Sequence, residues 1–407
     1  MTTKARHTAN LVDANGDVQT THLDNVPNEV AVSASAPSSP NEGDLWYDTT
    51  NEILKVYNAT DSAFIKVVTV TPVLSSVNGN ILSGSAGNLD LVGSGFLTSN
   101  LIVGFTPSGG STSNVTVTPT SDLTATVAIP SAIYGQSVGT TIGIKVTNND
   151  AKISGTVNKT VSTLPTGGTI STISGYRIHT FNSSANFVTT DTRTIEYLIV
   201  AGGGGGGWDV GGGGGAGGML TGSVIKSADT YSIVVGAGGA GAPNSTTQNS
   251  GTNSTALGFT ALGGGAGGNW TSGGSTRHGL DGGSGGGAGG WNQSANGGNG
   301  TFGQGNDGGD APTASAGKSG GGGGGAGGAG QDEQGTNSSD TALAGVGLAS
   351  SITGASVTYA IGGTGGNDFA YGSQADGETN KGGGGDGAGI GNPSAGGSGV
   401  VILRYAV

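Results

Sequence analysis

Short islands of aromatic and polar side chains interrupt the long glycine runs of this sequence, and they are the residues best suited to binding chemistry. Trp208, for example, is followed directly by Asp209. An aromatic ring beside a carboxylate, amide or guanidinium can stack on a sugar while its neighbour bonds the hydroxyl groups. The same rings could instead cap the glycine segments, which hold few other apolar side chains. The candidate binding residues are Trp208, Asp209, Trp270, Arg277, His278, Trp291, Phe302, Phe369 and Tyr371.

Residue patterns typical of enzymes do not fit this sequence. A dinucleotide-binding turn after Ala201 would need a helix next and an acidic residue about 20 positions on, but more glycine follows. Carboxylates such as Asp281 and Asp386 lie in glycine-rich loops, without the rigid pairing that glycoside hydrolysis needs. The histidines are scattered and lack metal-ligand spacing. We therefore expect no enzymatic activity, no catalytic residue, no metal site and no cofactor.

Composition narrows the class of protein further. The chain has 407 residues, of which 89 are glycine, and only 10% of the residues are charged. Its formal net charge of −12 provides no basic surface, so we expect no nucleic-acid partner. It has no cysteine, which excludes disulfides and thiolate metal sites. A secretion signal and a run of about 18 apolar residues are both missing, so we expect no membrane insertion.

Three regions follow one another along the chain, and all three are predicted to be β-structured. The apolar spacing of amphipathic helices is missing, while Gly, Thr, Ser and Asn dominate. We expect an all-β fold with an N-terminal β-hairpin attachment region, an immunoglobulin-like β-sandwich and a C-terminal glycine-rich β/polyglycine-II domain. The predicted boundaries are residues 1–70, 71–165 and 166–407.

The first region is predicted to centre on a β-hairpin. Residues 45–48 and 53–57 are typical of two strands joined by a turn, and a third run covers residues 64–70. So small a unit buries little apolar surface alone. We therefore expect a homo-oligomer, a trimer or a similar assembly, with Trp46 and Tyr57 in a shared core.

Two resemblances cover the first two regions. Residues 38–48 and 54–58 resemble a short module of phage structural and tail-fibre proteins, which implies docking to other virion proteins through the N-terminal region. The second region has evenly spaced strand-like runs, as in a β-sandwich. Its residues 72–74, 93–96 and 103–105 are similar to the TIG/IPT family of immunoglobulin-like domains, which implies a spacer or an interaction surface.

The third region alternates β-like runs with glycine runs. A polyproline-II-type helix has three residues per turn and no internal hydrogen bonds. If glycine occupied every contact, such helices could approach until backbone groups bonded between them. The spacing of Ala237 and Ala240 fits a helix with one face that tolerates a methyl group. Repeated elements are the tyrosines ahead of glycine runs and the pattern Gly-Gly-Gly-Ala-Gly-Gly, at Tyr197, Tyr231, Tyr359, Ala216, Ala266, Ala288 and Ala326.

The glycine-rich half also carries a family resemblance. Residues 175–181, 197–205 and 399–405 resemble the glycine-rich domains of phage tail-tip adhesins and tail-fibre C-termini. The resemblance implies a virion protein, a tail fibre or adhesin, that attaches to a host-surface glycan or outer-membrane protein through loops between glycine segments. The alternative is a purely structural capsid-fibre, decoration or baseplate component without receptor binding.

Overall fold

β-strands make up nearly all of the regular structure of this chain. Strands account for 36% and helices for 2% of the structure, which confirms the expected all-β fold. The single-turn helix α2 (Ser131–Tyr134) was not expected, because it is too short to show a helical period. The structure is a computed structural model that describes residues 30–50, 53–60, 62–66, 71–97, 100–270, 274–290, 294–311, 319–333, 341–368 and 375–407.

The chain divides into two compact units, and the division falls between Thr163 and Leu164. It lies close to the predicted start of the glycine-rich domain at residue 166. The finer boundary between residues 70 and 71 stays a prediction.

The first unit contains a small four-stranded sheet in which β1 runs parallel to β2 and the other pairs are antiparallel. Trp46 is only 6% exposed, because its ring packs edge-on against Phe64 with 5.3 Å between centroids. Tyr57 contacts the same Phe64 ring at 5.2 Å. A single chain thus already buries Trp46, and the shared oligomer core stays a prediction. The strands are β1 (Ala31–Ser33), β2 (Leu45–Asp48), β3 (Ile53–Asn58) and β4 (Ala63–Lys66).

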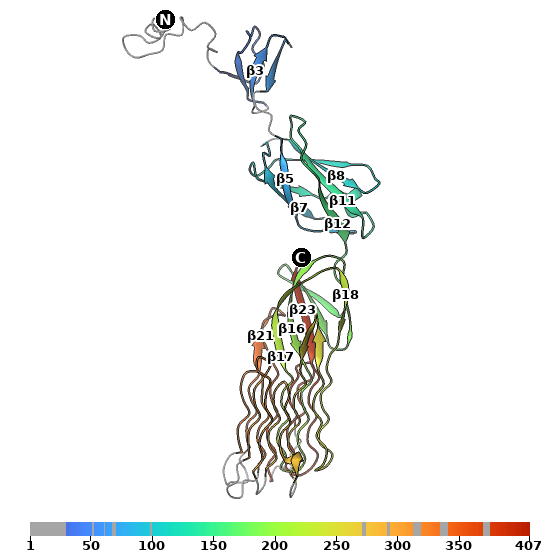
Figure 1. The fold of residues 1–407 in the computed structure, drawn as a ribbon, viewed down its shortest axis with the longest axis vertical. Helices are drawn as coiled ribbons and strands as arrows, with labels where there is room; N and C mark the ends of the chain where they lie inside the picture. Colours follow the sequence, from blue (N-terminus) through green and yellow to red (C-terminus); the bar gives the residue numbers. More distant parts are fainter. Residues whose placement is uncertain are drawn as a thin grey trace, which may run out of the picture. The chain divides into compact units, whose positions relative to one another are not determined.

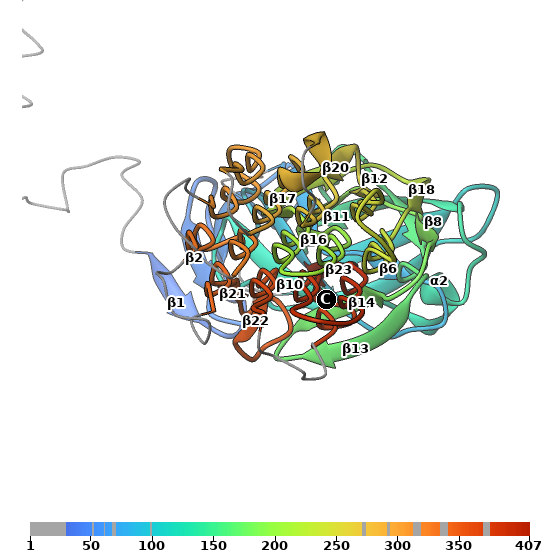
Figure 2. The same cartoon turned by 90° about the horizontal axis from the view of Figure 1, so that it is seen from below.

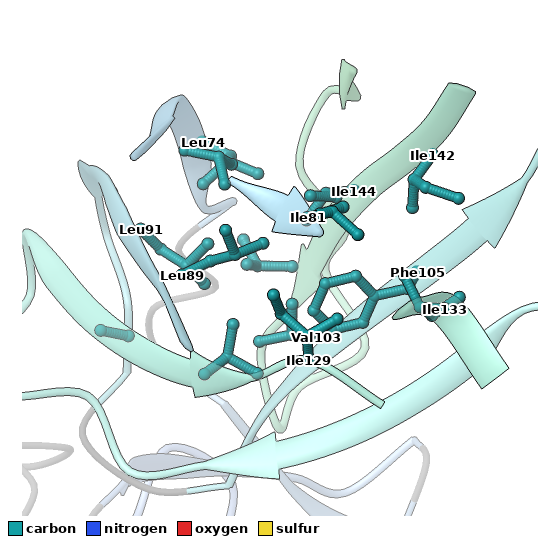
Figure 3. Packing of buried hydrophobic residues seen from close by; sticks show 14 of the residues in the cluster. Leu74, Ile81, Leu89, Leu91, Val103, Phe105, Ile129, Ile133, Ile142 and Ile144 are labelled. Atoms are coloured by element: carbon teal, nitrogen blue, oxygen red, sulfur yellow. The ribbon is translucent and has the colours of Figure 1, made fainter. Parts of the chain in front are cut away.

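The same unit contains a sandwich of two mainly antiparallel sheets around one apolar core, as predicted (Figure 3). Leu101, Val103 and Phe105 alternate inward along β8, and each is fully buried. The TIG/IPT assignment stays a resemblance. One sheet has the order β10 (Thr124–Ala128), β7 (Asn88–Ser94), β5 (Val73–Asn78). The other has the order β6 (Ile81–Leu82), β12 (Val157–Ser162), β11 (Thr141–Thr147), β8 (Leu101–Pro107), β9 (Ser113–Val117).

The second unit begins with a five-stranded antiparallel sheet that is apolar on both faces. Along β16, Tyr197 and Ile199 join one buried cluster, while Leu198 and Val200 join another. The sheet order is β13 (Thr169–Ile173), β14 (Tyr176–Phe181), β23 (Val400–Ala406), β16 (Arg193–Val200), β17 (Met219–Lys226). Three two-stranded sheets accompany it: β15 (Ala185–Thr189) with β18 (Asp229–Ile233), β19 (Ser254–Ala256) with β20 (Phe259–Ala261), and β21 (Leu348–Ser350) with β22 (Val357–Tyr359).

Extended segments, here called glycine helices, run side by side from this sheet (Figure 1). They include residues 202–207, 211–218, 236–242, 262–268, 284–290, 319–325, 360–367 and 382–388.

Backbone hydrogen bonds between glycine helices repeat every three residues. The N–H groups of Gly202, Gly203 and Gly204 donate to three different segments, and those of the next three residues return to the same segments in the same order. This repeat is that of a polyproline-II-type helix and confirms the polyglycine-II structure. The acceptors are the carbonyl groups of Thr252, Gly397, Gly215, Asn249, Ser394 and Gly212.

The helix at residues 202–207 is enclosed on all sides. Its carbonyl groups accept hydrogen bonds from three further segments, through the N–H groups of Gly264, Gly239 and Gly385. Figure 2 looks along these helices, which appear end on as packed coils. Every peptide group of the enclosed helix is therefore satisfied by a neighbour.

Packing at this distance leaves no room for a side chain at most inward positions, and the buried methyl groups of Ala216, Ala266 and Ala288 are exceptions. A Cβ atom at Gly205 would lie 2.1 Å from the carbonyl oxygen of Ala240. Outward positions do accept a methyl group: Ala237 and Ala240 are exposed, while Gly236 and Gly239 on the same helix are buried. The predicted period of three residues is confirmed.

Replacing Gly205 by alanine is expected to destabilise the glycine-rich unit by about 3 kcal/mol, because the new methyl group forces two backbones apart. Gly328→Ala is the matched control, since its Cβ would meet only a methyl group of Val346 at 3.2 Å. We expect the control to change stability by less than about 1 kcal/mol. Chemical unfolding of the full chain, followed by circular dichroism, measures both values. Equal losses in the two variants would contradict the packing argument.

Candidate binding site at the loop end of the glycine helices

Loops that connect the glycine helices gather at the end of the unit opposite the sheet (Figure 1). We call this the loop end, and the other the sheet end. The loop end is formed by residues 208–210, 269–270, 274–278, 368 and 389–392. Its loops are anchored on both sides by helices whose backbone groups are bonded to neighbours. They are therefore held in fixed relative positions.

Two tryptophans from separate loops come together there. The ring centroids of Trp208 and Trp270 are 6.5 Å apart, with planes tilted by 38°. The backbone N–H of Trp270 donates to the carbonyl oxygen of Trp208 at 2.9 Å. Buried Asn269 fixes both loops, since its Oδ1 accepts from the N–H of Trp208 and its Nδ2 donates to the carbonyl of Thr247, each at 2.8 Å. The two rings thus have defined positions.

A hollow of about 360 Å³ lies beside the tryptophans. Both indole rings are half-buried, so each keeps some surface for a ligand. Ile390, which is 45% exposed, adds an apolar side chain. The hollow therefore combines aromatic, aliphatic and acidic groups. It is lined by Trp208, Asp209, Trp270, Asp368, Ile390 and Gly391.

The backbone at Asp209 and Val210 is held in the left-handed region, with φ of +45° and +46°. This region is unusual for a β-branched residue such as Val210, which is buried here and donates its N–H to Gly389 at 3.0 Å. Burial, and secondarily the charge of Asp368, raises the pKa of Asp209. Backbone strain and an unfavourably placed charge at one position are typical of functional sites.

The remaining predicted site residues do not join this hollow. Arg277, in the 3₁₀ turn Ser275–Arg277, is 3% exposed and lies inside the loop end. His278 is exposed there, and its Nδ1 accepts from the N–H of Asn296 at 3.0 Å. Phe302 is fully exposed but lies at the sheet end, beside Leu348. The predicted residues Trp291, Phe369 and Tyr371 lie outside the described residues.

Three residues of the site were not among the sequence-based candidates: Asn269, Asp368 and Ile390. Asn269 precedes Trp270 and Asp368 precedes Phe369, so each lies within an island that the sequence marked. Ile390 is a lone apolar residue between glycines, and nothing in the sequence connects it with the tryptophans.

Several other carboxylates of this unit accept hydrogen bonds from backbone groups. Asp281, Asp307 and Asp310 accept backbone N–H groups of residues 297–300, at 2.6 to 2.8 Å. They replace a missing neighbour helix at the edge of the lattice. Among the described residues, no three acidic or histidine side chains converge as a metal site would need. The helices in those residues are too short or too polar to cross a bilayer.

The fold and the loop end define a glycine-rich β/polyglycine-II domain with an aromatic hollow. A family model described as a glycine-rich domain matches residues 179–406, more than half of the chain. The chain belongs to this glycine-rich domain family. None of the curated proteins compared with it matches.

Replacing Asp209 by asparagine is expected to stabilise the protein at pH 7 by about 0.5 kcal/mol, the order typical of partly solvated charge pairs. The raised pKa means that the folded state loses stability as the pH rises through the ordinary Asp value of 3.8 and the carboxyl group ionises. Asparagine carries no charge, so its advantage should disappear at about pH 3. Thermal unfolding of both proteins across this pH range checks the prediction, and a difference that is independent of pH would contradict it.

Proposed function

We propose that the chain is a structural and adhesive protein of a bacteriophage particle, a tail fibre or comparable appendage on the virion surface. Its glycine-rich domain attaches the particle to a host-surface glycan or outer-membrane protein. The observation that carries this proposal is the hollow between Trp208 and Trp270, presented by a rigid glycine lattice.

Rigid presentation favours binding because the loops lose little entropy when a ligand arrives. Half-buried tryptophan rings provide faces for stacking, and the carboxylates of Asp209 and Asp368 provide acceptors for hydroxyl groups. This is the combination expected of a carbohydrate-binding surface.

The direction of the chain also supports an adhesive role. Leu164, where the chain enters the unit, leads into the five-stranded sheet, and β23 belongs to the same sheet (Figure 1). The covalent connection to the first unit is therefore made at the sheet end. The loop end is not needed for that connection.

The first unit completes the proposal. In the proposed particle, the N-terminal region of the chain docks to other virion proteins, and the sandwich acts as a spacer. The chain forms a homo-oligomer such as a trimer. The chain performs no catalysis. The small four-stranded sheet and the sandwich support these roles because each is a compact β-structure, suited to a mechanical part of a fibre.

Adsorption to cells tests the proposal. Labelled full-length protein is incubated with a panel of Gram-negative strains, alone and with Trp270→Ala or Phe302→Ala. We expect adsorption to at least one strain and a loss of about tenfold or more for Trp270→Ala, as for a central interface tryptophan. Phe302→Ala is the matched control, because Phe302 is an exposed aromatic at the opposite end.

The same experiment defines the result against the proposal. If folded protein adsorbs to no strain, or if both variants adsorb like the unmodified chain, the adhesive function is excluded for this hollow. The structural alternative, a capsid-fibre, decoration or baseplate component, then accounts better for the chain.

A further inference from the structure

The hollow at the loop end is acidic as well as aromatic. Asp209 and Asp368 both line it, and none of the described lining residues carries a positive charge. Partial burial disfavours ionisation of Asp209, and the negative charge of Asp368 adds repulsion to it. A ligand that brings a positive charge would relieve this repulsion, whereas a phosphate or carboxylate ligand would increase it.

The tryptophan faces favour the same kind of ligand. The face of an indole ring attracts a cation within about 6 Å of its centroid, and the attraction is strongest where water is partly excluded. Trp208 and Trp270, whose centroids are 6.5 Å apart, offer two such rings around one small space. A volume of about 360 Å³ is near the lower limit for ligand pockets, about 300 Å³. It suits a single sugar residue or ammonium head group.

The rest of the chain shows what this pair of groups does with a cation. Among the described residues, an aromatic ring and a carboxylate share one basic side chain in three places. Lys55 lies 4.4 Å from the ring of Trp46 and 2.7 Å from Asp48. The other two sets are Arg193 with Tyr405 and Asp191, and Arg404 with Tyr176 and Glu196.

We infer that the hollow binds an ammonium group carried by a host-surface glycan, such as a free amino sugar or a choline-substituted sugar. The tryptophan rings of Trp208 and Trp270 and the carboxylates of Asp209 and Asp368 surround the ammonium group. A glycan is favoured over a protein lysine because half-buried ring faces also accept the apolar face of a sugar ring. The host-surface source of the ligand depends on the proposed function, but the preference for a cation does not.

The preference for charge can be measured without knowing the host. Choline and 3,3-dimethylbutan-1-ol have nearly the same shape, but only choline is charged. Calorimetric titration of the full chain at constant ionic strength is expected to show choline binding at least tenfold more tightly. Glucosamine should likewise bind more tightly than N-acetylglucosamine, whose nitrogen is neutral. Equal binding within both pairs, or no binding of any of the four compounds, would overturn the inference.

Variants assign the preference to the hollow. The double variant Asp209→Asn, Asp368→Asn is expected to bind choline no better than the neutral alcohol, while Trp270→Ala weakens both. Asp229→Asn, an exposed acidic residue at the sheet end, is the matched control and should keep the full preference. Unfolding curves exclude misfolding, since Asp209→Asn alone is expected to be slightly more stable. A double variant that keeps the preference for choline would overturn the inference.

Adsorption separates this inference from the proposed function. Adsorption that Trp270→Ala abolishes, but that neither choline nor the double variant affects, supports the adhesive function and overturns the ammonium assignment. Selective choline binding without adsorption to any strain supports the cation site and overturns the adhesive function. If choline competes with adsorption, but protease treatment of the cells abolishes adsorption, the ligand is a protein lysine and the glycan assignment is overturned.

Discussion

Neighbouring backbones of the glycine helices approach so closely that a Cβ atom fits at few of their inward positions. A polyproline-II-type helix has no hydrogen bonds of its own, so each buried N–H and C=O group must find a partner on another helix. From Gly202 onward, successive N–H groups donate to three neighbouring segments in turn, so the partners lie on three sides of one helix. Glycine loses more conformational freedom on folding than any other residue. The cost is offset because one helix helps to satisfy up to six others, which makes the lattice a single cooperative body.

The edge of the lattice explains why acidic and amide residues recur in the glycine-rich half. A helix at the edge has peptide groups that face no neighbour, and there side chains supply the acceptors. Asp281 and Asp307 accept N–H groups at Asn299 and Gly300, and Asn253 accepts the N–H of Gly263. Part of the net negative charge is therefore a consequence of backbone satisfaction. Asp209 and Asp368 differ from these residues because they line a hollow.

Local patterns predicted the elements well, and they predicted their arrangement poorly. The strand Leu45–Asp48 has the predicted bounds because its residues are strongly β-forming. Residues 249–253 form part of the lattice, yet their Asn, Ser and Thr content is typical of a loop. Successive lattice segments run alternately toward the loop end and the sheet end. If one segment is not recognised, every later loop is assigned to the wrong end. This is why the sequence identified Trp208, Trp270 and Phe302 alike as binding residues, but could not tell that Phe302 lies at the sheet end.

Strand β23 occupies the middle of the five-stranded sheet, between β14 and β16, although it follows all the glycine helices in the chain. During synthesis, the ribosome must deliver residues 400–406 before Leu198 and Ile199 receive their partners Ile402 and Val401. A product that stops earlier leaves these apolar side chains and the strand edges uncovered, as a substrate for chaperones and proteases. The five-stranded sheet can therefore form only after the whole glycine-rich domain has been synthesised, so its apolar strands stay uncovered longest during translation.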